Sequence, residues 1–191
     1  MTSSGRFQVL RASTRPATAW LNGGGVTREV AGFPAGAGLD AFDWRVSLAD
    51  VASAGPFSPF PGIDRVITLV EGAGMALTVD GAERLVDAPF RPFAFSGDAS
   101  TDCRLLAGPA VDFNVMTRRG RVEATVDLAT APTTVGVPDG STALVVCLAG
   151  TATLDGVELA RYDAALIDGS GTYGLRPGGT TAVVTFRTAA V

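Results

Sequence analysis

The stretch Gly55–Gly81, GPFSPFPGIDRVITLVEGAGMALTVDG, decides the fold of this chain. It begins with prolines and aromatic residues, continues into the apolar run Val66–Val70, turns at Glu71–Gly74, and ends in a second β-rich run, Ala76–Val79, that stops at an Asp-Gly pair. Strand, tight turn, strand, tight turn is the signature of antiparallel pairing. The cluster Ile63-Asp64-Arg65 places charges beside bulky apolar residues where the first strand begins, so it is the first place to look for chemistry.

The same hairpin unit recurs in the second half of the chain. Residues 143–154, followed by Asp155-Gly156, repeat the order of apolar strand, glycine turn, short strand and Asp-Gly turn. No segment has the period of a long amphipathic helix. We therefore expect an all-β fold of two antiparallel β-barrels or jelly-roll sandwiches. Residues 1–120 would form the N-terminal half and residues 121–191 the C-terminal half, sharing strands in one compact unit.

Composition excludes several classes of function. The chain has 191 residues with a formal net charge of −4, and all 15 of its basic residues are arginine. An acidic balance argues against nucleic-acid binding, which needs a basic face. No apolar run is long enough to span a membrane, and the N-terminus has no apolar signal core. We therefore expect a cytoplasmic protein, with Cys103 and Cys147 as reduced, buried thiols.

Histidine is absent from the sequence. Its absence removes imidazole metal ligands, Ser-His-Asp triads and Cys-His pairs together. Catalysis, if present, would rely on carboxylates, arginine, serine, tyrosine or a thiol.

Two alternating strands carry polar residues on one face. In Phe42–Leu48, Arg45 and Ser47 fall opposite the apolar positions; in Val111–Met116, Asp112 and Asn114 share a face with Met116. A buried polar pair must be hydrogen-bonded, so Asp112 and Asn114 are either a satisfied structural network or a ligand-orienting pair. Arg45 is as consistent with an exposed face as with a pocket.

Arg65 is the strongest candidate for ligand contact. An arginine entering a strand offers a planar fork for a carboxylate. The alternative is an ion pair with Asp64 or another acid. Adjacent strand residues point to opposite faces, so Asp64 is a poor partner.

A glycine-rich loop, Trp20–Gly25, precedes a strand that ends at Gly32. It lacks the Lys-Ser/Thr of a nucleotide-binding loop, so a turn between strands is favoured, although the Asn22 amide could face a small ligand. The aromatic residues Trp20, Phe57 and Phe60 could wall a pocket, but such residues are more often core.

The strand and turn Ile67–Gly72 resemble half of a cupin. By that resemblance, Arg65 falls where the cupin glutamate ligand would stand, and Ser58 and Phe60 fall near its two histidine positions. The resemblance thus implies a metal site that has been erased, with no transition metal and no cofactor.

A closer resemblance is to the HutD/Ves family, carried by the blocks WLNGGGVTREV, FDWRVSLADV, GPFSPFPGIDRVITLVEG, FSGD and DFNVMTRR in this order. They cover about Trp20–Arg119; the remainder matches in layout only. The resemblance implies a metal-free bicupin, often encoded with histidine-utilisation genes, that binds a small carboxylate metabolite and acts in regulation.

Three functions remain open from the sequence: a regulatory, carboxylate-binding bicupin; a metal-free enzyme, such as an isomerase or hydrolase using Asp64 or Asp112; and a dimerising module without a ligand. Because sheet edges must be covered or paired, we expect a homodimer. The ligand-binding candidates are Arg65, Arg45, Ser47, Asn22, Asp112, Asn114, Ser58, Phe60 and Trp20.

Overall fold

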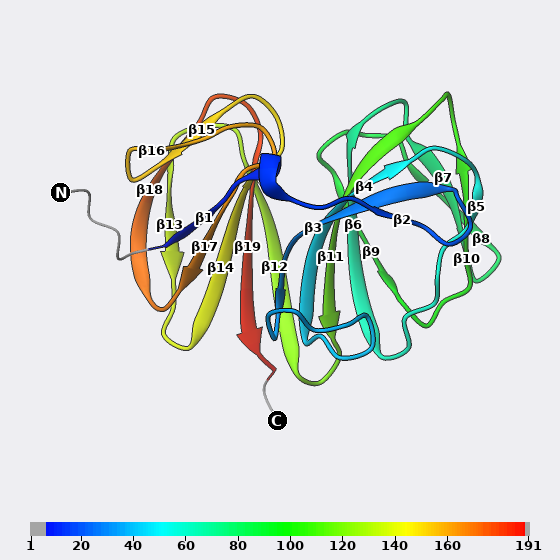
Figure 1. Cartoon of the computed structure of the whole chain (residues 1–191), viewed down its shortest axis with the longest axis horizontal. Coiled ribbons are helices and arrows are strands. Elements are labelled where there is room, and N and C mark those ends of the chain that lie inside the picture. The colour runs from blue at the N-terminus through cyan, green and yellow to red at the C-terminus, as the bar shows by residue number, and fades with distance from the viewer. Residues whose placement is uncertain (1–6, 190–191) are drawn as a thin grey trace. The chain divides into compact units, whose positions relative to one another are not determined.

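The computed structural model describes residues 7–189 and consists almost entirely of antiparallel β-strands (Figure 1). Among these residues the one helical element is a single 3-10 turn, η1 (Ala12–Thr14). The chain divides into two compact units. The first unit comprises residues 15–121, and the second joins the described residues up to Thr14 to those from Val122 onward.

The first unit pairs a six-stranded sheet with a four-stranded one. The large sheet has the order β2-β3-β4-β11-β6-β9 and the small sheet the order β5-β10-β7-β8. The strands of the large sheet are β2 (Thr18–Ala19), β3 (Gly25–Phe33), β4 (Trp44–Val51), β6 (Ile63–Glu71), β9 (Pro92–Ser96) and β11 (Ala110–Arg118). Those of the small sheet are β5 (Gly55–Pro56), β7 (Met75–Val79), β8 (Ala82–Val86) and β10 (Thr101–Leu105).

The second unit has the orders β1-β17-β14-β19-β12 and β13-β18-β15-β16. Its larger sheet contains β1 (Gln8–Leu10), β12 (Val122–Ala129), β14 (Ser141–Cys147), β17 (Ala164–Asp168) and β19 (Thr181–Thr188). Its smaller sheet contains β13 (Thr133–Val137), β15 (Ala152–Leu154), β16 (Val157–Leu159) and β18 (Gly171–Pro177).

The two units repeat one strand plan. Strands β4, β11, β6 and β9 are neighbours in the order in which β12, β19, β14 and β17 are neighbours, and β5-β10-β7-β8 corresponds to β13-β18-β15-β16. The tight turns agree in detail: Asp80 and Gly81 have φ of 47° and 79°, and Asp155 and Gly156 have 45° and 81°. Positive φ at both central residues is the requirement of a type I′ hairpin turn, which Asp-Gly meets well. The repeat seen in the sequence is therefore a structural repeat.

Each unit buries an apolar core between its two sheets. In the first unit, Ile67 and Leu69 of β6 pack against Met75 and Leu77 of β7. In the second unit, Val145 of β14 packs with Leu154 of β15 and Leu175 of β18 in a cluster that is apolar throughout. The side of each large sheet that faces its small sheet is called the inner face below.

The prediction of an all-β, antiparallel fold is confirmed. The finer prediction of closed barrels is not met: within residues 7–189 none of the four sheets closes on itself, and each unit is a pair of open sheets. The N-terminal strand also differs from expectation. Phe7–Leu10 was expected in the N-terminal half, but β1 pairs with β17, with Val9 opposite Ala165. The hydrogen bonds between β1 and the distant β17 decide this placement, and the local pattern of residues does not predict them.

Both cysteines, Cys103 and Cys147, are buried and free, as predicted. No helix in the described part of the chain is long and apolar enough to cross a membrane.

Candidate functional site

Arg65 lies on the inner face of the first unit. It is two residues before Ile67, so it shares the face of β6 that Ile67 and Leu69 present to the core. Only 6% of the residue is exposed. Across the sheet it pairs with Met116 of β11 and with Phe95 of β9. A guanidinium is therefore placed at the rim of an apolar core.

Three phenylalanines surround this guanidinium. Its central carbon lies 4.9 Å from the ring centroid of Phe95, 5.4 Å from that of Phe57 and 5.5 Å from that of Phe60. We call these three rings the arginine cage. Aromatic faces attract a cation through their quadrupole, most strongly where water is excluded. The cage thus fixes the side chain while leaving its N–H edge free to meet an acceptor.

In the described part of the chain, Arg65 forms no ion pair with a carboxylate. Among the described residues, none of the ion pairs within 4 Å and none of the hydrogen bonds involves its guanidinium, and Nε is buried without a partner. Burial lowers the pKa of Arg65 to about 10; Asp112 opposes this decrease and Arg45 adds to it. The group remains a cation at neutral pH, and a buried cation without a paired anion is costly.

Asp112 and Asn114 lie on the same inner face, farther along β11. Asn114 pairs with Ile67 and Asp112 with Leu69, so both share the face of Arg65. They are 2% and 8% exposed, respectively, and the Oδ1 atom of each is buried without a hydrogen-bond partner. They form no satisfied structural network among the described residues. Asp112 and Asn114 are therefore not hydrogen-bonded to each other through these oxygen atoms.

Burial raises the pKa of Asp112 to about 7, while the charge of Arg65 lowers it and that of Asp50 raises it. Asp112 in turn adds to the effect of burial on Cys103, whose pKa rises to about 11. Cys103 belongs to the facing small sheet, which agrees with an inward direction for Asp112. A carboxyl group with a pKa near 7 can take up or release a proton at neutral pH, and together with a cation on the same face it can hold a polar molecule.

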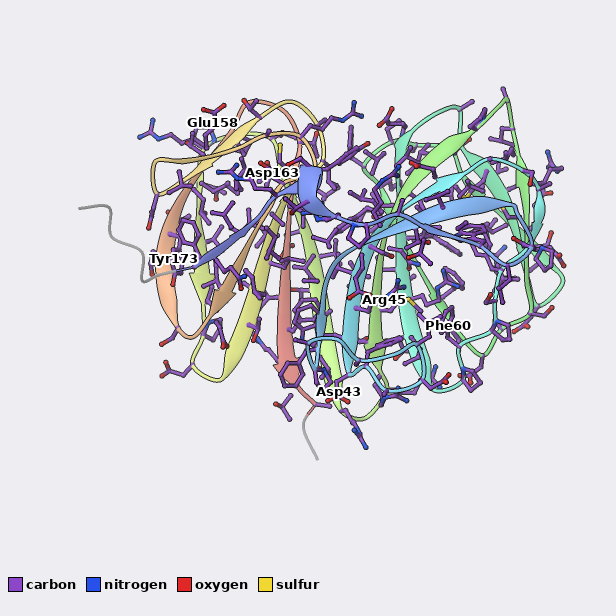
Figure 2. The ribbon with its side chains drawn as sticks, viewed as in Figure 1. Asp43, Arg45, Phe60, Glu158, Asp163 and Tyr173 are labelled. Atoms are coloured by element: carbon purple, nitrogen blue, oxygen red, sulfur yellow. The ribbon has the colours of Figure 1, made fainter. Side chains whose placement is uncertain are left out.

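Arg45 and Ser47 complete the inner face on β4. Arg45 pairs with Met116, and Ser47 pairs with Asn114 and is 1% exposed. Arg45 has its own partner, since its Nε donates to Glu29 Oε2 at 2.6 Å. The exposed-face alternative for Arg45 is not realised, because its side chain is only 14% exposed. Figure 2 labels Arg45 on β4 and Phe60, a cage ring from the loop before β6.

The remaining candidates lie away from this polar group. Asn22 is exposed, and its Oδ1 accepts from the Gly24 amide at 2.9 Å, so it stabilises the glycine loop. Ser58 is exposed. Trp20 is partly buried, donates from Nε1 to Thr27 Oγ1 at 2.7 Å, and meets Phe57 edge-on with ring centroids 6.2 Å apart. Trp20 therefore contacts the arginine cage through Phe57.

Sequence reasoning did not single out Phe95 or Glu29. Phe95 lies in an edge segment broken by prolines, 30 positions after Arg65, and only the pairing of β6 with β9 brings it to the guanidinium. Glu29 meets Arg45 across a strand irregularity between Glu29 and Ala31. The alternation Phe93-Ala94-Phe95 was the available signal, since it places two rings on one strand face.

The second unit lacks this polar group. When the two hairpin units are aligned at their glycine turns, Gly72 and Gly150, Arg65 corresponds to Ala143. Through the strand registers, Asn114 then corresponds to Val183 and Asp112 to Thr181. The inner cluster of the second unit is apolar. The polar group is thus specific to the first unit.

A hollow of about 330 Å³ lies elsewhere on the first unit, lined by Leu85, Val86, Asp87, Ala88, Arg91, Pro92 and Phe93. Phe93 stacks on the cage ring Phe95, with centroids 5.8 Å apart. None of the inner-face polar residues lines this hollow.

Comparison with known proteins places the chain in a family. The family model described as HutD matches residues 12–184. An uncharacterised 21.2 kDa protein of the hutC 3′ region of Pseudomonas putida is 46% identical over 111 residues, which is 58% of each chain. Protein Ves of Citrobacter koseri is 42% identical over 115 residues, or 60% of this chain and 59% of that protein. The match therefore spans less than two thirds of the length of these two relatives.

Solved structures agree over nearly the whole chain. HutD from Pseudomonas fluorescens SBW25 is 34% identical with a TM-score of 0.87, covering 96% of this chain and 100% of that one. YhhW from Escherichia coli, at 10% identity, shares the fold alone, with a TM-score of 0.70 over 97% of this chain and 98% of the other. The architecture is cupin-like. On the extent of the family match, this chain belongs to the HutD family.

Proposed function

We propose that this protein binds a small carboxylate metabolite on the inner face of its first unit, with Arg65 as the anion anchor, and that binding serves regulation in histidine utilisation or a related pathway. The observation that carries the proposal is a buried guanidinium held by three aromatic rings with no internal carboxylate on it. A planar guanidinium is the side chain best suited to bidentate recognition of a carboxylate.

The arrangement favours an exogenous anion over a permanent internal one. Asp64, the nearest acid in sequence, is exposed and accepts from Arg119 Nη2 at 2.7 Å. Glu29 is engaged by Arg45. Burial raises the pKa of Asp112 to about 7, so this carboxyl group is only partly ionised at neutral pH and is a weak permanent partner for Arg65. The guanidinium is thus left available, and a small anion would lower the cost of its burial.

The regulatory part of the proposal draws on the family. The Pseudomonas putida relative is named for the hutC 3′ region. A protein that senses a pathway metabolite needs a binding site but no catalytic group. We place this protein in the cytoplasm as a homodimer. We also propose that it works without a metal or other cofactor, because histidine is absent and Ser58, Phe60 and Arg65 occupy the positions of cupin metal ligands.

One observation favours a second function, a metal-free enzyme such as an isomerase or hydrolase acting on a small carboxylate. Asp112, with a pKa of about 7, is poised for general acid or base work at neutral pH. The two functions predict different fates for a bound carboxylate. Nuclear magnetic resonance of a bound carboxylate over hours would detect turnover, and unchanged ligand would leave the binding function standing.

A thermal-shift screen tests the binding proposal. Small carboxylates, including histidine-pathway intermediates, should raise the melting temperature of the wild-type protein by mass action, and the matching neutral amides should not. The increase should persist in Arg104→Ala, which removes an exposed arginine on β10, and should be lost in Arg65→Ala. A carboxylate-induced shift of equal size in Arg65→Ala would contradict the proposed anchor.

A further inference from the structure

The inner-face polar group has two chemically different ends. Arg65, beside Met116, contributes only hydrogen-bond donors. Two and four residues along β11, Asn114 and Asp112 contribute buried oxygen atoms without partners. Four residues of strand correspond to about 13 Å between the Cα positions of Met116 and Asp112. The guanidinium donors thus lie at one end of a line of inward-facing residues, and the buried oxygen atoms without partners lie at the other.

The two ends do not satisfy each other. Arg65 and Asp112 influence each other's pKa, yet no ion pair within 4 Å joins them in the described structure. Buried polar atoms in folded proteins nearly always have a partner. A carboxylate on Arg65 would satisfy the donor end only. The buried oxygen of Asn114 and those of ionised Asp112 require a donor, which a carboxylate ligand without an N–H or O–H group lacks.

The second unit offers a comparison within the same chain. At the positions of Asn114 and Asp112 it carries Val183 and Thr181, and at the position of Arg65 it carries Ala143. The same strand plan therefore folds without the arginine, the amide or the carboxylate, although Thr181 keeps a buried hydroxyl group whose Oγ1 also has no partner. The guanidinium, the carboxylate and the amide occur together in one unit and are absent together from the corresponding positions of the other, which is what a single two-ended site requires.

We propose that the ligand of the first unit is a bifunctional small molecule, with a carboxylate for Arg65 at one end and an N–H donor for Asp112 and Asn114 at the other. The inference rests on the proposed function and narrows its ligand class. A carboxylate that ends in a hydrocarbon or a ketone leaves both acceptors unsatisfied. A carboxylate that ends in an amide supplies the missing donors while keeping nearly the same shape.

Matched pairs of probes test this inference on the wild-type protein. Succinamate and 4-oxopentanoate differ only by NH₂ in place of CH₃, as do the longer glutaramate and 5-oxohexanoate. Calorimetry at pH 8, where Asp112 is mainly an acceptor, should give tighter binding of the amide in at least one pair, by about five- to a hundred-fold. Two lengths are used because the ligand must span the two ends.

Two variants test which residue causes the difference between the amide and ketone affinities. Asn114→Val installs the residue of the second unit and should narrow the gap between the amide and ketone affinities. Thr68→Val is the matched control: Thr68 is also fully buried with an unpaired Oγ1, but it lies between Ile67 and Leu69 and thus points away from the inner face. This variant should leave the gap unchanged.

The outcomes separate this inference from the proposed function. Equal affinities within both pairs, with binding abolished in Arg65→Ala, would overturn the donor requirement and leave the carboxylate site intact; water would then satisfy the two acceptors. Failure of all four probes to bind would overturn the inference, and the further absence of any carboxylate-induced shift in the thermal screen would overturn the proposed function as well. An amide preference that persists undiminished in Asn114→Val, and equally in Asp112→Thr, would place the donor contact elsewhere and overturn the inference.

Discussion

Asp64 and Arg65 are neighbours in sequence but lie on opposite faces of β6, one exposed and one buried. Asp64 accepts from Arg119, which also donates to Asp98 Oδ2 at 2.8 Å, and Arg65 is enclosed by the arginine cage. The alternation of the strand separates the two charges. A strand that entered the sheet one residue out of register would bury Asp64 and expose Arg65, so the alternation of these two residues disfavours that register of β6.

The first prediction concerns Arg65 and uses any carboxylate that the screen identifies. Arg65→Ala should weaken binding by about ten- to more than a hundred-fold, because it removes a charge-assisted contact of roughly 1.5–3 kcal/mol. Arg65→Lys should recover only part of the affinity, since an ammonium cannot form the bidentate fork. Titration calorimetry measures both, and full recovery by lysine would argue for a point-charge contact.

The second prediction is a pH dependence of stability. Burial raises the folded-state pKa of Asp112 from 3.8 to about 7, so between these values the folded protein binds more protons than the unfolded chain. The contribution of Asp112 to stability therefore falls as pH rises from about 4 to 7 and is flat above. The full loss is on the order of 4 kcal/mol. Arg65, Asp50 and Cys103 are the titratable groups that interact electrostatically with Asp112.

Chemical denaturation of the wild type and Asp112→Asn across this range isolates that contribution. The free energy of unfolding of the variant should increase relative to that of the wild type as pH rises from 4 to 7, because the variant has no carboxyl group to ionise at this position. The comparison is needed because Asp98 and Asp163, whose pKa values are lowered, give slopes of the opposite sign in both proteins. Parallel stability curves would mean that Asp112 ionises normally.

The third prediction concerns Asp163 in the second unit (Figure 2). Burial raises the pKa of this carboxyl group, but hydrogen bonds from the Ala12 amide, the Arg11 side chain and the Ala160 amide outweigh burial and lower it. Asp163 Oδ2 accepts from Arg11 at 2.6 Å and Oδ1 from Ala12 at 2.7 Å, so the carboxylate holds the segment that follows β1. Its stabilising effect is present above the unfolded pKa and is lost as pH falls.

Asp163→Ala should therefore destabilise the protein by about 1.5–3 kcal/mol and speed hydrogen exchange in β1 (Gln8–Leu10). The amide hydrogen-exchange rates of β6, measured by mass spectrometry, should be the same as in the wild type. Protection of β1 equal to that of the wild type would mean that its pairing with β17 suffices to hold it.

The fourth prediction is the absence of zinc, iron, nickel and copper from protein purified without added metal. Sequence positions that would carry cupin ligands hold Ser58, Phe60 and Arg65. Within residues 7–189, no three or more Cys, Asp or Glu side chains gather where an ion could sit. Elemental analysis checks the prediction, and a stoichiometric amount of any of the four metals would contradict it.

The fifth prediction is a homodimer in solution. In the first unit, β2 and β9 lie at the edges of the six-stranded sheet, and edge strands must be covered, charged or paired. Light scattering at micromolar concentration should give twice the monomer mass of 19.4 kDa. A monomer under these conditions would count against the prediction.

Much of the fold follows from local patterns. The hairpin at Ile63–Val79, the alternation of β4 and β11 and the internal repeat are all legible in the sequence, because side-chain period and turn residues are local properties. The inward direction of Arg65 also follows, since Ile67 and Leu69 share its face. The same period placed Asp112 and Asn114 together.

Partners that meet across long stretches of sequence could not be found in this way. Phe95 reaches Arg65 through the β6–β9 pairing, and Glu29 reaches Arg45 across an irregular register. The pairing of β1 with β17 joins segments more than 150 residues apart. That no acid within residues 7–189 forms an ion pair with Arg65 is likewise a property of the assembled sheets, because the sequence supplies 19 acidic residues.

The structural repeat separates two demands that a single domain would have to reconcile. In the second unit, the inward positions at Ala143 and Val183 are subject only to the requirement that they pack well. In the first unit, the corresponding Arg65 and Asn114 each keep a buried polar atom without a hydrogen-bond partner. A duplicated chain can therefore drift toward new ligands in one half while the other half keeps its solid core. For protein engineering, new specificities should be sought at inward positions of the first unit, and stabilising substitutions in the second.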